Sequence, residues 1–234
     1  MTQILLWGVV SASSLLLGAL LALARDWHRP TIGRILAFGA GALIASVSLE
    51  LAEEGVNTGG AVAVGVGLAL GAAAYFTANR VVERRGGGSG GGSGAALTVG
   101  ALLDGIPEQV VLGVGLAAGG EISLALVVAI FVSNLPEAIG SSADLLRAGK
   151  TRRHVLTQWS VVTVVCILAT VVGGLLAELA TPGMTAGVQG FAAGALLVML
   201  IDTMIPEARE QGGETAGLVT VVGFALACGL SLLG

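Results

Sequence analysis

The sequence predicts an all-α membrane protein with eight transmembrane helices. Of its 234 residues, 55% are hydrophobic and only 11% are charged, and the mean hydropathy is +0.93. This composition excludes an ordinary soluble domain. A helix needs about 20 mostly apolar residues to cross a bilayer. Eight stretches meet that requirement, so we expect helices at 3–24, 32–52, 59–79, 96–118, 122–146, 156–178, 186–206 and 215–233.

The basic residues give an independent check on the number of helices. Eight helices alternate the loops between the two sides of a membrane, and all eleven lysines and arginines then fall on one side. They are Arg25, Arg29, Arg34, Arg80, Arg84, Arg85, Arg147, Lys150, Arg152, Arg153 and Arg209. Cytoplasmic loops are enriched in such residues. We therefore expect a multi-pass protein in the lipid bilayer of the inner (cell) membrane, with both termini on the outer, periplasmic side.

The first apolar stretch is expected to remain in the protein as a helix. A cleaved signal peptide ends at a small-residue processing site, whereas 3–24 is followed by polar and basic residues. After the third helix, the run at 86–94 contains only glycine and serine, which is typical of a flexible coil. Its regularity suggests an engineered replacement of a natural loop. The expected organisation is helices 1–3 in 1–85, a linker at 86–94 and helices 4–8 in 95–234, forming one transmembrane domain.

The fourth and fifth helices each carry a proline followed by glutamate. Pro107 precedes Glu108, and Pro136 precedes Glu137 at a spacing of 29 residues. Proline removes a backbone hydrogen bond from a helix, and an ionisable side chain at the bilayer centre costs at least about 2.5–3.5 kcal/mol. Residues that carry such costs inside a membrane usually serve a function.

Polar side chains share the faces of these two glutamates. Residues four apart lie on one face of a helix, so Asp104 accompanies Glu108 and Ser133 accompanies Glu137. The stripe on the fifth helix continues toward the inner surface as far as Asp144. Each proline also leaves one backbone carbonyl without its helical donor. Because carboxylates crowded in a low dielectric repel one another unless they share protons or a cation, a bound divalent cation is the simplest interpretation.

Two sequence similarities indicate inverted repeats, formed by helices 1–3 and 6–8 around a core of helices 4 and 5. The first is the proline-glutamate match between helices 4 and 5. The second relates Phe38–Leu43 to Phe191–Leu196 at an offset of 153, which also aligns Glu54 with Glu207. By the loop count, the members of each pair run in opposite directions, as in many transporters. The alternative is that Gly/Ala-rich membrane helices resemble one another by composition alone.

Other polar residues have weaker claims to a site. Asp202 lies in the inner half of the seventh helix, deep enough that we favour a functional role. Glu50 could equally line an entrance or be a solvated helix end, and Gln109, about 100° around the helix from Glu108, is a weaker ligand candidate. Solvation near the membrane interfaces or in basic loops explains most of the rest: Glu53, Glu54, Glu207, Glu210, His28 and His154.

The cysteines and the net charge suggest no further chemistry. Cys166 and Cys228 lie within apolar helices without CxxC spacing, so we interpret both as inert packing residues. The formal net charge is −4, and the basic residues serve as membrane anchors. Nucleic-acid binding therefore has no support.

At these residues the chain resembles the Zrt/Irt-like (ZIP) family of metal transporters. That family has eight helices, both termini outside, a variable inner loop between helices 3 and 4, and His-Asn-x-Pro-Glu-Gly-type metal-binding motifs in helices 4 and 5. The resemblance covers nearly the whole chain outside the linker. It implies a metal site centred on two glutamates, with further ligands beside them and acidic residues on the inner path: Glu108, Glu137, Asp104, Ser133, Asn134, Asp144 and Asp202.

The chain departs from the family's pattern in ways that affect metal preference. Asp104 stands where the fourth helix usually has histidine, and Ser133 where the fifth often has histidine or glutamine. The sixth helix has no counterpart of the family's glutamate ligand. An all-oxygen set is harder than a histidine-rich one and suits Mn²⁺, although carboxylates also bind Zn²⁺. We expect one main metal site with a weaker neighbour.

The predicted function is transport, with no enzymatic activity: a ZIP-like carrier of a divalent metal ion toward the cytoplasm, with zinc favoured over manganese, iron or cadmium. Small-residue faces allow a homodimer. A proton-coupled carrier of a small organic solute is disfavoured because aromatic residues make up only 4% of the chain. An intramembrane aspartyl protease using Asp104 and Asp202 is a further alternative, although such enzymes do not usually pair their carboxylates with proline-glutamate steps.

Overall fold

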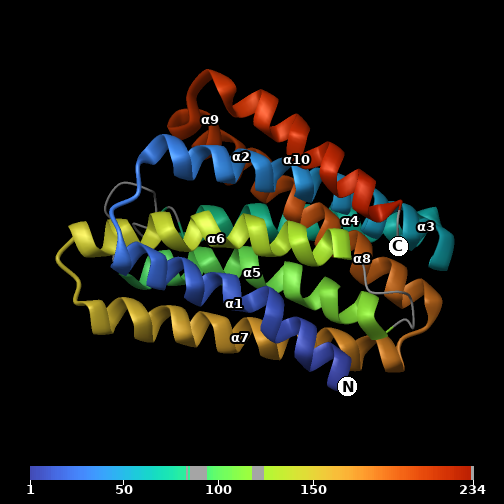
Figure 1. Ribbon diagram of the computed structural model, residues 1–234. Helices are drawn as coiled ribbons and strands as arrows, with labels where there is room; N and C mark the ends of the chain where they lie inside the picture. Colours follow the sequence, from blue (N-terminus) through green and yellow to red (C-terminus); the bar gives the residue numbers. More distant parts are fainter. Residues whose placement is uncertain (83, 85–93, 118–123, 233–234) are drawn as a thin grey trace.

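A computed structural model describes residues 1–82, 84, 94–117 and 124–232, and within these ranges every regular element is a helix (Figure 1). The side chains of residues 94–99, 104, 124, 125 and 178 lie outside this description. The linker predicted at 86–94 also lies outside it, apart from Gly94 at the start of a helix. The predicted all-α fold is confirmed for the described part of the chain.

The helices follow the predicted apolar stretches closely. The long ones are α1 (Thr2–Ala24), α2 (Arg29–Ser46), α4 (Ala61–Val82), α5 (Gly94–Ala117), α6 (Leu124–Arg147), α7 (Arg152–Leu179), α8 (Pro182–Met199) and α10 (Ala216–Ser231). Seven stretches in the described residues are long and apolar enough to cross a membrane, the last of them running from Pro182 to Ser231. Helices α5 and α6 each continue through the internal proline that the sequence places there.

Two helices extend further than the sequence predicted. Helix α2 passes through a π-helical stretch, η1 (Val47–Glu53), into α3 (Glu54–Gly59). Helix α8 likewise passes through η3 (Leu200–Met204) into α9 (Ile205–Gly212), which is followed by the short 3₁₀ turn η4 (Gly213–Thr215). The predicted ends at 52 and 206 were therefore wrong. Proline is tolerated in the first turn of a helix, where Pro206 lies, so it does not stop the chain there.

Each of these extended helices ends at a glycine with a left-handed backbone. Gly60 has φ of 92° and Gly213 has φ of 68°, a region that costs glycine little and other residues more. The chain reverses after each glycine, into α4 and α10 respectively. Helix α4 then packs on α8, and α10 packs on α2.

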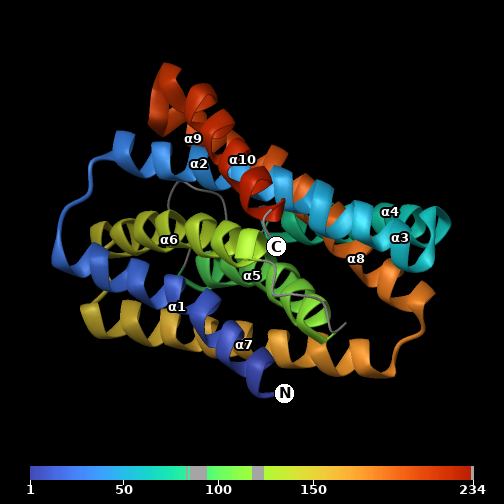
Figure 2. The same cartoon turned by 45° about the vertical axis from the view of Figure 1, so that its right-hand side comes forward.

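The helices pack as two bundles, which Figures 1 and 2 show from two sides. The first bundle contains α1, α5, α6 and α7, with α5 against α7 and α1 against both α6 and α7. The second bundle contains α2, α3, α4, α8, α9 and α10. The two meet where α2 packs on α6 and where α5 packs on α8. The N- and C-termini lie at the same end of the molecule, opposite the connections from α1 to α2 and from α6 to α7.

Glycines allow the closest helix pairs to approach through their backbones. A Cβ at Gly71 of α4 would overlap the carbonyl oxygen of Phe191 on α8, and one at Gly223 of α10 would overlap the carbonyl oxygen of Phe38 on α2. In the first bundle, Gly113 of α5 abuts the backbone of α7 in the same way. Small residues at helix contacts are typical of membrane proteins, in which close van der Waals packing drives association.

The outward faces of the helices are strongly apolar. On α7, large exposed hydrophobic side chains recur every three or four residues: Val161, Val164, Leu168, Val172, Leu175 and Leu176. Helices α1, α4 and α10 expose similar faces. A patch of this extent is unfavourable in water but suits contact with lipid. The fold is therefore that of a multi-pass membrane protein.

Candidate cation site

Glu108 and Glu137 project from neighbouring helices of the first bundle. Glu108 lies in the middle of α5 with only 1% of its surface exposed, and Glu137 is partly buried on α6. Both carboxylates lie within electrostatic range of the thiol of Cys166, which α7 contributes. Three different helices therefore place polar groups around one buried region. These are the two glutamates that the sequence placed at the centre of the site.

Two further predicted residues of α6, Ser133 and Asn134, are buried about one turn before Glu137. Ser133 is fully buried, and its hydroxyl donates to the carbonyl of Ile130 at 3.0 Å. Asn134 is 1% exposed, and its amide nitrogen makes no hydrogen bond within the described part of the chain. The backbone of Asp104 lies in α5, but its side chain is outside the description.

Helix α2 reaches the proline-containing part of α6 through a glycine. A Cβ added at Gly39 would lie 2.9 Å from Cα of Ser133 and 3.3 Å from the carbonyl oxygen of Val132. That carbonyl is the one that Pro136 deprives of its helical donor. Bulk at Gly39 would therefore press directly on the segment that carries Ser133 and Asn134.

A buried polar cluster lies one residue beyond Glu108. Gln109 is fully buried, and its side-chain oxygen accepts hydrogen bonds from Ser11 of α1 at 2.9 Å and from Thr170 of α7 at 2.7 Å. Its amide nitrogen makes no hydrogen bond to any described residue. From its position in the sequence, Gln109 was only a weak ligand candidate. Its observed bonds tie three helices of the first bundle together next to the candidate site.

The described side chains do not form a ready-made metal cluster. Among them, no group of three or more histidine, cysteine, aspartate or glutamate side chains is close enough to hold a metal ion. The arrangement offers two carboxylates, a thiol, an amide and a hydroxyl from α5, α6 and α7. These groups could bind a small cation if the side chains converge on it.

The acidic residues predicted on the inner path are not equally placed. Asp144 is exposed at the end of α6 and forms an ion pair with Arg147 at 2.9 Å. Asp202 is exposed on η3, which packs on α2, α8 and α9. The structure brings neither of them to Glu108 and Glu137 as a cluster.

Glu207, rather than Asp144 or Asp202, lies against the face of α6 that carries Glu137. It is partly buried, accepts a hydrogen bond from the amide nitrogen of Gln211 at 2.8 Å, and lies within electrostatic range of Asp144. Its carboxylate is 4.0 Å from the position of a Cβ at Gly140, on the face of α6 that also carries Glu137 one turn earlier. Sequence position alone suggested a solvated residue. The absence of a side chain at Gly140 was the signal that a neighbouring helix could approach there.

A second acidic group lies at the opposite end of the second bundle. The hydroxyl of Ser231 donates to the carboxylate of Glu50 at 2.5 Å, and Glu50 lies within electrostatic range of Glu54. This hydrogen bond fixes η1 against the end of α10. Glu50 is only partly buried, which is compatible with either an entrance or a solvated helix end.

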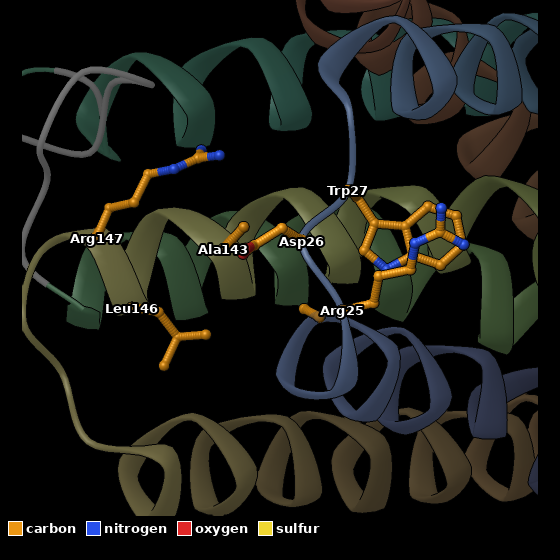
Figure 3. Close-up of a pocket in the computed structure, with 7 residues that line it drawn as sticks. Arg25, Asp26, Trp27, Ala143, Leu146 and Arg147 are labelled. Carbon is orange, nitrogen blue, oxygen red and sulfur yellow. The ribbon is translucent and has the colours of Figure 1, made fainter.

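A pocket of about 250 Å³ opens at the end of the molecule that carries the basic loops. Figure 3 shows Asp26 pointing toward Ala143 of α6, with Arg147 on the opposite side of the pocket from Arg25 and Trp27. The indole nitrogen of Trp27 donates to the carbonyl of Leu21 at 3.1 Å. Acidic and basic side chains are mixed around this pocket, so it has no strong preference for an ion of one sign.

A scan against models of known protein families finds no match, and a search of curated proteins finds no similar sequence. The interpretation of the site therefore depends on its own residues and their surroundings.

Proposed function

We propose that this protein is a ZIP-like transporter that moves Zn²⁺ or a similar divalent cation, such as Mn²⁺, Fe²⁺ or Cd²⁺, across the inner membrane toward the cytoplasm. The observation that carries the proposal is the pair of proline-linked glutamates, Glu108 and Glu137, held on adjacent membrane-length helices in a buried region. Burying a carboxylate at membrane depth is costly, and two carboxylates close together in a low dielectric repel one another. A cationic substrate would balance both charges.

The proposal requires eight membrane crossings. The 50 residues from Pro182 to Ser231 would extend about 75 Å as one helix, against a hydrocarbon core of about 30 Å. The reversal at Gly213 divides this stretch into α8 with α9, and α10. Two crossings there give eight in all, which puts both termini on the periplasmic side under the positive-inside rule.

We further propose that the two halves of the second bundle are inverted repeats. Helices α2 and α8 both have 18 residues, and α8 begins 153 residues after α2, the offset found in the sequence. Each leads into a π-helical stretch, and each extended helix ends before a glycine of positive φ. The contact of Gly71 with Phe191 has a counterpart in the contact of Gly223 with Phe38. These matched features are hard to attribute to shared composition.

In this proposal Glu108 and Glu137 bind the cation, assisted by Asp104, Asn134 and Ser133. Glu207 and Asp144 mark the path toward the cytoplasm along one face of α6, and Asp202 takes part only where the path opens. The carboxylates supply charge and the amide and hydroxyl supply neutral oxygen, a set that binds hard and borderline divalent ions. No role is assigned to the pocket beside Asp26.

Transport would occur by movement of one bundle against the other, so that the site opens alternately to each side. The polar cluster around Gln109 supports such a movement, because it ties α1, α5 and α7 into a unit. The contact between Gly39 and the backbone near Ser133 lies at the boundary between the two bundles. Small side chains at such a boundary allow helices to slide without large rearrangements.

Uptake of a radioactive metal ion into proteoliposomes tests the function. The wild-type protein should accumulate ⁶⁵Zn²⁺, and the double variant Glu108→Gln, Glu137→Gln should lose this uptake. Glu53→Gln removes a carboxylate that is exposed at the far end of η1, so it serves as a matched control and should retain wild-type rates. Unchanged uptake by the double variant would end the proposal, as would a wild-type protein that transports none of the four metals.

A further inference from the structure

We propose that Gln211 is a positioning residue for transport: its side-chain amide holds the carboxylate of Glu207 beside Gly140 of α6, where that carboxylate receives the cation on its way to the cytoplasm. This inference rests on the proposed transport function and adds to it a residue that controls how fast the cation leaves. Gln211 lies on α9, one turn after Glu207. The sequence alone indicated no role for it.

One hydrogen bond fixes which oxygen of Glu207 faces α6. The amide nitrogen of Gln211 donates to Oε1 of Glu207 at 2.8 Å, and the same oxygen lies 4.0 Å from the position of a Cβ at Gly140. An ionised carboxylate only accepts hydrogen bonds, so the amide must present its nitrogen, not its oxygen, to Glu207. Hydrogen bonds to charged groups are among the stronger ones in proteins. This bond therefore restricts the rotamers of Glu207 to those that face α6.

Packing against α2 holds Gln211 itself in place. A Cβ at Gly33 of α2 would lie 2.7 Å from Cβ of Gln211 and would overlap the backbone nitrogen of Gly212. The backbone of α9 therefore lies directly on α2, and the side chain of Gln211 starts from a fixed point. Its side-chain oxygen is buried and has no hydrogen-bond partner within the described part of the chain. Buried polar atoms are usually satisfied, so this oxygen is a spare neutral acceptor beside the carboxylate.

The position beside Gly140 falls between two carboxylates that α6 carries on this face. Glu137 precedes Gly140 by three residues and Asp144 follows it by four, so the three positions lie on one side of the helix. At a rise of about 1.5 Å per residue, Gly140 lies about 4.5 Å along the axis from Glu137 and about 6 Å from Asp144. Because glycine has no side chain, Glu207 of α9 supplies the carboxylate that α6 lacks at this level. A cation leaving Glu137 then meets a carboxylate at every turn.

Loss of the amide should affect release of the cation and not its capture. Gln211 belongs to the second bundle, whereas the proposed binding residues Glu108 and Glu137 belong to the first. Without the amide, Glu207 is free to turn from α6 toward water, because a glutamate side chain has three rotatable bonds. A carboxylate that samples several rotamers spends less time beside Gly140. We therefore expect a lower maximal rate of transport without weaker binding of the cation on the outer side.

The kinetics of ⁶⁵Zn²⁺ uptake by the full-length protein in proteoliposomes test this assignment. Gln211→Leu removes the amide at similar size, so it should lower the maximal rate about fivefold or more without raising the Zn²⁺ concentration for half-maximal uptake. Glu210→Gln alters the adjacent, exposed carboxylate of α9 and should keep the wild-type rate. Elution as a single species in detergent checks that each variant is folded, and Gln211→Met provides a second replacement. A wild-type maximal rate in both Gln211 variants would overturn the proposal.

A double variant separates a positioning role from a purely structural one. If Gln211 acts through Glu207, Gln211→Leu should slow uptake in the wild-type background but cause no further loss in Glu207→Ala, where the amide has no carboxylate to hold. An equal loss in both backgrounds would overturn the proposal in favour of a structural role. A wild-type rate in Glu207→Ala would also overturn it, while leaving the transport function intact. Absence of uptake of all four metals by the wild type would instead refute the transport function, and this inference with it.

Discussion

Alanine at Gly71 or at Gly223 is expected to destabilise the second bundle, because each glycine lies against the backbone of a neighbouring helix. A methyl group at Gly71 would overlap the carbonyl oxygen of Phe191, and one at Gly223 would overlap that of Phe38. The obstructing atoms belong to the main chain. A change of rotamer therefore cannot relieve either clash, and the helices α4 and α8, or α10 and α2, must move apart.

The expected size of the effect follows from two opposing contributions. Adding a methyl group to a filled contact costs about 1–3 kcal/mol in unfolding free energy. Alanine is a better helix former than glycine by about 0.8–1.0 kcal/mol, which offsets part of that cost. Because relief requires movement of whole helices, we expect a net loss of about 1–2 kcal/mol for each substitution, which is about a five- to thirtyfold change in the ratio of folded to unfolded protein.

Matched controls are available on the same two helices. Among the described residues, no atom of another part of the chain lies within 4 Å of a Cβ built at Gly65 on α4 or at Gly229 on α10. Alanine at these positions should leave the unfolding midpoint in detergent unchanged or raise it slightly. If all four variants unfolded at the same midpoint, the packing argument would be refuted. If only one of the two contact glycines mattered, the proposed equivalence of the two halves would fail.

Three further predictions address the site and its surroundings. Gln109→Leu should lower the free energy of unfolding in detergent by about 0.6–1.7 kcal/mol for each lost interhelical hydrogen bond, and with it the unfolding midpoint. An unchanged midpoint would show that the cluster does not tie α1 to α7. Glu207→Gln should slow ⁶⁵Zn²⁺ uptake more than Asp202→Asn, because Glu207 lies against α6 and Asp202 is exposed on η3; the reverse order would restore Asp202 to the path. Gly39→Val should reduce the rate of ⁶⁵Zn²⁺ uptake, since the added side chain meets the backbone of α6 beside Ser133; unchanged uptake would mean that this contact between the bundles does not matter for transport.

Most of the fold could be predicted because membrane helices are specified by length and hydropathy. The apolar stretch 61–82, for example, has no alternative way to satisfy its backbone in lipid. The continuation of α2 and α8 through π-helical stretches could not be predicted in this way. Insertion of one residue into a helical turn changes neither composition nor periodicity enough to be recognised, and the helix ends predicted at 52 and 206 were therefore too early.

The site was only partly predictable, because sequence spacing defines faces within one helix but not the faces that meet between helices. The proline-glutamate pairs were recognisable, since a carboxylate in an apolar stretch is costly wherever the helix packs. Cys166 was interpreted as inert because a thiol in an apolar helix is inexpensive to bury and gives no comparable signal. Its position against Gly105 becomes visible only when α7 packs on α5. The same limit applies to Glu207, which the sequence placed at the end of a helix and the fold placed against Gly140 of α6. In both cases a glycine on the partner helix lets the side chain approach, because no Cβ stands in its way.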